Sequence, residues 1–172
     1  RRRKDLRLRP RRRHPYPHRG EGRVGRLIDT PASVGLKDLL RREREEIRAR
    51  HVAGSLGGQV ATALCDLNDR IISAAYRELA GSSPPAFGEQ VALVAVGGYG
   101  RGDAAPFSDV DLLVLHAPRA GAAVRDAINV LVRGLWDVGM KLSQSVRTPD
   151  GCISFAKQDL PMRTALTEAR YL

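Results

Sequence analysis

The sequence predicts an α+β domain in which a small mixed sheet is flanked by helices and preceded by N-terminal helices. Two apolar segments with strand composition, residues 91–96 and 110–115, lie on either side of a glycine-rich turn. Amphipathic helical patterns precede and follow this pair, and a third strand pattern occupies residues 140–147. The order helix, strand, strand, helix, strand favours a mixed sheet covered by helices.

Apolar residues that recur at helical spacing predict three longer helices. Residues 36–51 form a strongly charged helix whose apolar residues share one side. Residues 59–79 carry a longer apolar stripe, which ends before the helix-breaking segment GSSPP. A third helix is expected over residues 119–138, between the second and third strands. Two short helices are expected to close the chain.

The excess positive charge of the chain lies entirely at its beginning. Residues 1–26 contain twelve Lys and Arg against two acidic residues, whereas residues 27–172 contain seventeen of each sign. The prolines, the self-repulsion and the scarcity of apolar residues predict a disordered basic arm over residues 1–30. Such an arm can attract nucleic acid, but no aromatic platform or folded basic groove accompanies the charge, so nucleic-acid binding is not expected.

These observations divide the chain into the basic arm, N-terminal helices over residues 36–80 and a core over residues 88–172. Cys65 and Cys152 have no histidine partners at metal-ligand spacing, which indicates ordinary thiols in a reducing compartment. No apolar run approaches the roughly 20 residues that a membrane helix needs. A cytoplasmic protein without membrane contact is therefore expected.

Two aspartates at the start of the second strand are the strongest candidates for chemistry. Successive side chains of a strand point to opposite faces, so Asp109 and Asp111 project from one face while Val110 points to the other. Two carboxylates this close repel each other unless a cation lies between them or one is protonated, and their oxygens suit Mg²⁺. Asp109 and Asp111 are therefore predicted to be catalytic metal ligands.

The glycine-rich turn before these aspartates is the candidate phosphate site. Gly97 and Gly98 follow the first strand, and glycine lets backbone amides approach phosphate oxygens closely. Ser108 is a candidate for a further hydrogen bond to the nucleotide, and Arg101 for a charge-assisted one. A glycine cluster alone usually marks only a turn, and an isolated pair of aspartates is often a solvated strand entrance. Their order between two apolar strands favours a nucleotide site.

The segment GGYGRGDAAPFSDVDLLVL, residues 97–115, resembles the signature of the DNA polymerase beta-like nucleotidyltransferases. In this form it looks like the bifunctional PII uridylyltransferase/uridylyl-removing enzymes. The similarity continues upstream over residues 53–80 and downstream over residues 136–172, so it covers most of the chain.

This resemblance implies a nucleotidyltransferase palm that uses Mg²⁺ to transfer UMP from UTP to a tyrosine hydroxyl of the PII nitrogen-signalling protein, with release of pyrophosphate. It places Asp109 and Asp111 on the metal. The nucleotide-binding residues would be Gly97, Gly98, Arg101 and Ser108. The spacing of these residues does not itself select uracil. An adenylyltransferase, which would differ only in base and acceptor, and an inactive nucleotide-binding remnant remain as alternatives.

A third metal-binding carboxylate, which many members of the superfamily supply from a later strand, is absent from residues 141–148. The nearest candidates are Asp137, Asp150 and Glu168, each of which also suits a surface or helix-cap position. Lys141 and Arg147 are alternative groups that could face the triphosphate.

Members of the resembled family continue through more of the transferase domain, an HD hydrolase domain and two ACT domains that sense glutamine. None of these follows in this sequence, and none of its histidines is followed by aspartate. The sequence is therefore expected to be an N-terminal part of such an enzyme. Weak or no transfer is expected of it alone, with glutamine sensing confined to the missing C-terminal part.

Overall fold

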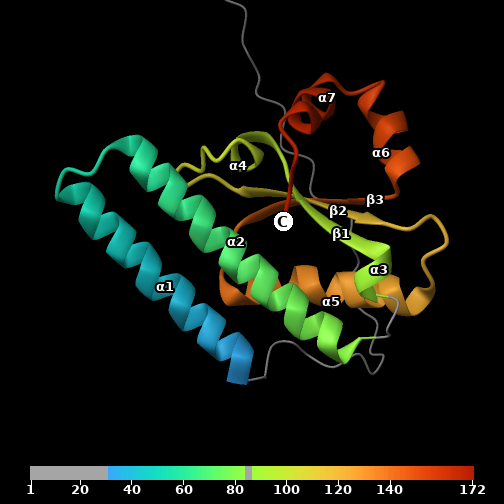
Figure 1. Ribbon diagram of the computed structural model, residues 1–172, viewed down its shortest axis with the longest axis horizontal. Coiled ribbons are helices and arrows are strands. Elements are labelled where there is room, and N and C mark those ends of the chain that lie inside the picture. The colour runs from blue at the N-terminus through green and yellow to red at the C-terminus, as the bar shows by residue number, and fades with distance from the viewer. Residues whose placement is uncertain (1–30, 84–86) are drawn as a thin grey trace, which may run out of the picture.

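The structure, a computed structural model, describes residues 31–83 and 87–172. The predicted basic arm over residues 1–30 lies outside them. α1 (Pro31–Val52) and α2 (Gly57–Ser82) form an antiparallel helical hairpin that lies beside the sheet (Figure 1). In the part of the chain that the structure describes, no helix is both long and apolar enough to cross a membrane.

The sheet has four strands in the order β3-β2-β1-β4. β1 (Val91–Ala95) is antiparallel to β2 (Val110–His116), and β2 is parallel to β3 (Leu142–Arg147). The short β4 (Arg170–Tyr171) pairs antiparallel with the other side of β1. The predicted α+β fold, a mixed sheet flanked by helices, is confirmed. β4 was not predicted, because two residues are too few to show alternation.

Helices connect and extend the strands. The short α3 (Phe87–Gln90) leads into β1, and α5 (Ala122–Val138) links the parallel strands β2 and β3. α6 (Pro149–Ala156) and α7 (Leu160–Thr167) follow β3. Each of these last two helices begins with a side-chain cap, because Thr148 and Asp159 accept hydrogen bonds from backbone amides in the first turn.

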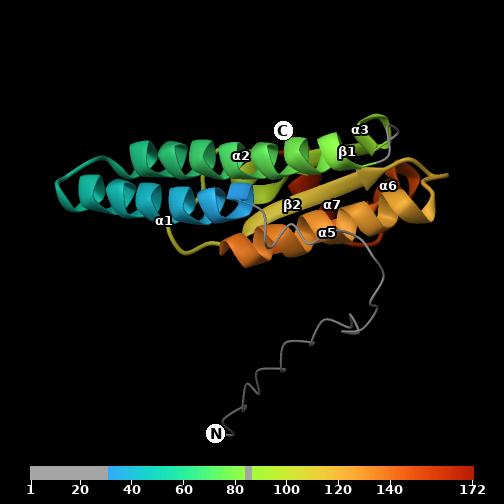
Figure 2. The ribbon, with the colours of Figure 1, turned by 90° about the horizontal axis from the view of Figure 1, so that it is seen from below.

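The two faces of the sheet are covered by different helices (Figure 1, Figure 2). On one face, Leu112 and Val114 belong to the main apolar cluster together with residues of α2 and α5. On the other face, Leu113 packs with Cys152 of α6 and with apolar residues of α7. Because both faces are covered, β2 is apolar on both sides.

The helical hairpin is part of the same core as the strands. Leu67 and Ile71 of α2 are fully buried in the main cluster, which also contains Ile47 of α1. The Tyr76 hydroxyl on α2 donates a 2.8 Å hydrogen bond to the Val91 carbonyl of β1. The hairpin and the sheet therefore share one continuous hydrophobic cluster.

This shared core predicts that a cavity in α2 destabilises the whole domain. Leu67→Ala should lower the free energy of unfolding by about 2–5 kcal/mol. Leu160→Ala, in a side chain that is 67% exposed, is the matched control and should have little effect. In urea unfolding followed by circular dichroism and by Trp136 fluorescence, both signals should shift together. Separate transitions would contradict a single core.

Candidate functional site

The site is built where β1 ends and β2 begins. The register pairs Ala95 with Leu112, and one residue further the amide of Val96 donates a 3.1 Å hydrogen bond to the carbonyl of Asp111. The chain then turns through α4 (Gly97–Gly100), a single helical turn. This antiparallel pairing places the glycine turn beside the first residues of β2, as the sequence predicted.

Gly97 lies beside the Asp111 carboxylate. A Cβ added to Gly97 would lie 3.0 Å from Oδ2 of Asp111, and the φ of Gly97 is +59°, in the left-handed region. Any side chain at position 97 would therefore be strained in its backbone and would press on the carboxylate. Glycine leaves the space beside this oxygen open.

The Asp111 carboxylate is half-buried, whereas Asp109 is exposed just before the strand. Burial raises the pKa of Asp111 above its ordinary value, a hydrogen bond from the Ser143 hydroxyl opposes this rise, and the negative charge of Asp109 adds to it. Ser143 is the register partner of Asp111 on β3. The two aspartates are thus near enough to repel each other, which is the arrangement that a bound cation would relieve.

Backbone groups define the shape of the turn. The amide of Asp103 donates to the carbonyl of Gly98 at 2.8 Å, and the amides of Gly100 and Arg101 donate to the carbonyls of Val96 and Gly97. Within residues 31–83 and 87–172, the amides of Gly97 and Gly98 donate to no backbone carbonyl. They are therefore among the backbone donors that the start of the turn offers a ligand.

The other two predicted nucleotide-binding residues are engaged within the protein. The Arg101 guanidinium pairs with Asp103 at 3.2 Å and with Glu168, although it still lies near Gly98. The Ser108 hydroxyl donates to the carbonyl of Ala105 at 2.9 Å and so closes the loop before β2. To donate to a nucleotide the Ser108 hydroxyl would have to exchange its partner, whereas Arg101 keeps N–H groups that these pairs do not use.

The candidates for a third carboxylate are dispersed. Asp137 is exposed on α5, which covers the opposite face of the sheet from α6 and α7, and Asp150 is exposed in the first turn of α6. Glu168 lies beside the turn but is paired with Arg101. Along residues 31–83 and 87–172, no group of three or more His, Cys, Asp or Glu side chains is arranged to hold a metal.

The two basic candidates, Arg147 at the end of β3 and Lys141 just before its start, lie at different distances from the aspartates. Arg147 pairs in register with Leu115, four residues along the strand from the pairing of Asp111 with Ser143, which is about 13 Å at strand spacing. Its guanidinium lies over the Phe155 ring at 3.9 Å. Lys141 is exposed just before β3, and its carbonyl accepts from the amide of Val110 at 2.7 Å. Of the two candidates, Lys141 is therefore the one that lies beside the aspartates.

Three residues that sequence reasoning missed support the turn from inside. Tyr99, within the turn, is buried, and its hydroxyl donates to Asp69 of α2. Asp69 also accepts two hydrogen bonds from Arg170 of β4. The signal in the sequence was Tyr99 itself, because a solvent-exposed turn does not require a large aromatic side chain among its glycines. Its partners lie 30 and more residues away, beyond the reach of local patterns.

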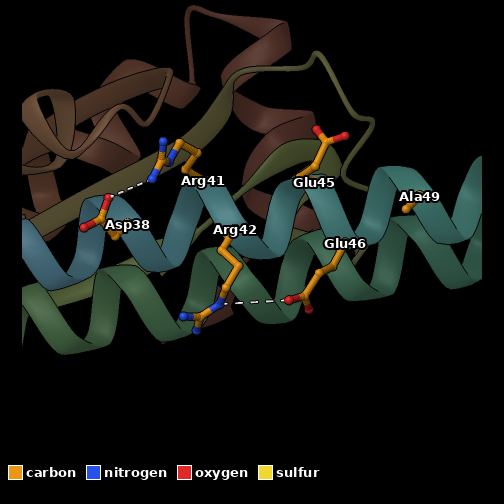
Figure 3. Close-up of a pocket in the computed structure, with 6 residues that line it drawn as sticks. All are labelled: Asp38, Arg41, Arg42, Glu45, Glu46 and Ala49. Carbon is orange, nitrogen blue, oxygen red and sulfur yellow. Dashed lines mark hydrogen bonds and ion pairs between the residues drawn. The ribbon is translucent and has the colours of Figure 1, made fainter.

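A surface depression on the outer side of α1 is not part of this site. It is lined by Asp38, Arg41, Arg42, Glu45, Glu46 and Ala49 (Figure 3). Its charged groups pair along the helix itself, Arg41 with Asp38 at 3.3 Å and Arg42 with Glu46 at 3.9 Å. These are solvated pairs of one helix face, and they contribute little to binding or stability.

Gly100 provides a direct test of the packing beneath the turn. A Cβ at this position would lie 2.2 Å from the carbonyl oxygen of Glu168, so Gly100→Ala should cost about 1–3 kcal/mol of stability. Gly58→Ala in α2 is the control, because a Cβ there meets nothing within 4 Å and alanine favours a helix. Thermal melts should show a decrease only for Gly100→Ala. Equal melting temperatures for the two variants would contradict the close packing.

Comparison with known proteins agrees with this geometry. Residues 85–159 match the nucleotidyltransferase domain family. Over 141 residues, which make up 80% of its length, the chain is 38% identical to the bifunctional uridylyltransferase/uridylyl-removing enzyme of Phenylobacterium zucineum. Over 147 residues, 83% of the chain, it is 37% identical to the enzyme of the same name from Azospirillum brasilense.

The matched part of these relatives is short. The alignments cover 15% of the Phenylobacterium zucineum enzyme and 16% of the Azospirillum brasilense enzyme. The Pseudomonas putida enzyme is 36% identical over 154 residues, and the alignment covers 16% of its length. The chain thus contains a nucleotidyltransferase domain, and over most of its length it is related in sequence to the bifunctional uridylyltransferase/uridylyl-removing enzymes.

Proposed function

We propose that this domain transfers UMP from UTP to a tyrosine hydroxyl of the PII signalling protein and releases pyrophosphate. The observation that carries the proposal is the close approach of Gly97 to the Asp111 carboxylate. It brings an open backbone turn and a pair of acidic side chains to one end of the sheet. The choice of UMP rests on the relatives, whose names describe uridylyl transfer. The choice of PII rests on the resemblance of the motif.

The residues at the end of the sheet fit a bound Mg²⁺. Asp109 and Asp111 offer carboxylate oxygens, which are the ligands that Mg²⁺ prefers. The pKa of Asp111 is raised by burial and by Asp109. A cation bound by the two carboxylates would therefore offset the repulsion between them. When bound, Mg²⁺ would lower the pKa of the attacking hydroxyl and neutralise charge on the leaving pyrophosphate.

The transfer forms one bond and breaks another at the α-phosphorus of UTP. The acceptor oxygen bonds to this phosphorus, the bond to the bridging oxygen of the β-phosphate breaks, and the hydroxyl proton is released to solvent. The amides of Gly97 and Gly98 would donate to phosphate oxygens, while Asp109 and Asp111 hold the cation beside them. Catalysis of this kind consists mainly of positioning and electrostatic stabilisation.

Ser143 is proposed to orient the metal-binding carboxylate. Its hydroxyl bonds to Asp111 from the neighbouring strand, which restricts the rotation of that side chain. A hydrogen bond to a ligating carboxylate is a common means of fixing its direction. The position opposite Asp111 on β3, where a third acidic ligand could have stood, is thus taken by a neutral donor.

Transfer by this chain alone is expected to be weak. We predict that Asp109→Asn and Asp111→Asn each reduce it on the order of a hundredfold or more, because each removes a ligand charge at nearly constant shape. The test is incorporation of label into PII from each of the four labelled NTPs in the presence of Mg²⁺. Asp137→Asn, an exposed carboxylate on α5, is the matched control and should retain activity. Label from UTP alone would support uridylyl transfer, and label from ATP would favour an adenylyltransferase.

A stability measurement on the same variant separates loss of function from loss of fold. Because burial raises the pKa of Asp111 in the folded protein, the charged form destabilises the fold at any pH above the ordinary carboxyl pKa. Asp111→Asn should therefore melt at an equal or higher temperature than the wild type at neutral pH without Mg²⁺. A marked decrease in melting temperature would mean that Asp111 is a structural residue.

A further inference from the structure

The glycine turn is anchored from inside by Tyr99. The Tyr99 side chain is only 2% exposed, although the residues on both sides of it are glycines. Its hydroxyl donates to Oδ1 of Asp69, which lies on α2, 30 residues earlier in the chain. Burial raises the pKa of the Tyr99 hydroxyl far above its ordinary value, and the bond to Asp69 raises it further, so the hydroxyl remains a proton donor.

Asp69 joins the turn to a third element. Both of its oxygens accept from the guanidinium of Arg170 on β4, at 2.7 and 3.1 Å. The same guanidinium lies 5.5 Å from the centroid of the Tyr99 ring. A carboxylate that takes a two-point bond from arginine and a third from a phenol is restricted in position and direction.

The anchor lies next to the part of the turn that faces Asp111. Gly97 and Gly98 have no side chains with which to hold themselves in place. Their carbonyls accept hydrogen bonds from the amides of Arg101 and Asp103 within the turn. The turn as a whole is attached by the bond of Val96 to β2 on one side and by the buried Tyr99 on the other. A shift of the Tyr99 ring would therefore move the amides of Gly97 and Gly98 relative to Asp111.

We propose that Tyr99 and Asp69 are positioning residues for triphosphate binding. They touch neither nucleotide nor metal, and they act by holding the amides of Gly97 and Gly98 at the place where phosphate oxygens are bound. This inference rests on the proposed function, and it extends the site into α2, a helix that carries no nucleotide-binding motif of its own.

The experiment compares two tyrosine hydroxyls. Tyr99→Phe removes the bond from the turn to α2, and the control Tyr76→Phe removes a bond from α2 to the Val91 carbonyl. Both leave the ring in place. Binding of UTP in the presence of Mg²⁺ is measured by calorimetry, together with melting temperature and amide hydrogen exchange over residues 97–101.

Loss of one hydrogen bond should lower the melting temperatures of the two variants by similar amounts. We expect the Kd for UTP to rise about fivefold in Tyr99→Phe and to stay within about twofold of wild type in Tyr76→Phe. Exchange over residues 97–101 should accelerate only in Tyr99→Phe. Asp69→Asn should also raise the Kd, and combining it with Tyr99→Phe should give less than the product of the two single effects, because both act through one bond.

The outcomes separate this inference from the proposed function. Equal changes in Kd for Tyr99→Phe and Tyr76→Phe, or unchanged exchange over residues 97–101 in Tyr99→Phe, would overturn the positioning role. If the wild-type protein binds no UTP, the proposed function fails instead. The exchange measurement then still decides whether Tyr99 fixes the turn.

Discussion

The antiparallel pairing of β1 with β2 is the constraint on which the rest of the site depends. It ends with the hydrogen bond from the Val96 amide to the Asp111 carbonyl, which sets the position of Gly97 against the Asp111 side chain. A slip of one residue in this register would turn Asp111 toward the apolar cluster of α2 and α5. It would also bring Leu112 to the glycine turn. The apolar residues on both faces of β2 oppose such a slip, so the core fixes the site.

The site is electrostatically unfavourable in the protein alone. Asp111 is half-buried, Asp109 stands close enough to raise its pKa, and the Ser143 hydroxyl offsets only part of this cost. Selection for stability alone would favour a neutral residue at position 111, because a half-buried carboxylate beside a second negative charge is unfavourable. The arrangement is understandable if a cation and a polyphosphate complete it. The cost is tolerable because the apolar cluster that surrounds the strands is large and continuous.

Local patterns in the sequence were enough to predict the fold class and the contact at the centre of the site. Apolar runs with strand composition identified β1 and β2, and helical periodicity identified α2 and α5. The glycine turn next to the two aspartates indicated where the strands would bring them together. The partners of the loop side chains could not be predicted. Arg101 pairs with Glu168, 67 residues away, and Asp69 with Arg170, 101 residues away. Such pairs depend on tertiary packing, which produces no periodic pattern in the sequence.

The residues that support the turn extend beyond the matched nucleotidyltransferase domain. The nucleotidyltransferase domain match covers residues 85–159, and this range leaves out Asp69, Glu168 and Arg170, all of which hold the turn or a residue within it. The similarity to the uridylyltransferases runs over 141 to 154 residues, which is too long to be confined to the domain match. It therefore includes Asp69 of α2, although that residue bears no recognisable motif. In the proposed function the glycine turn and the two aspartates supply the chemical groups, and the packing of α2 and β4 beneath the turn supports the turn through Tyr99.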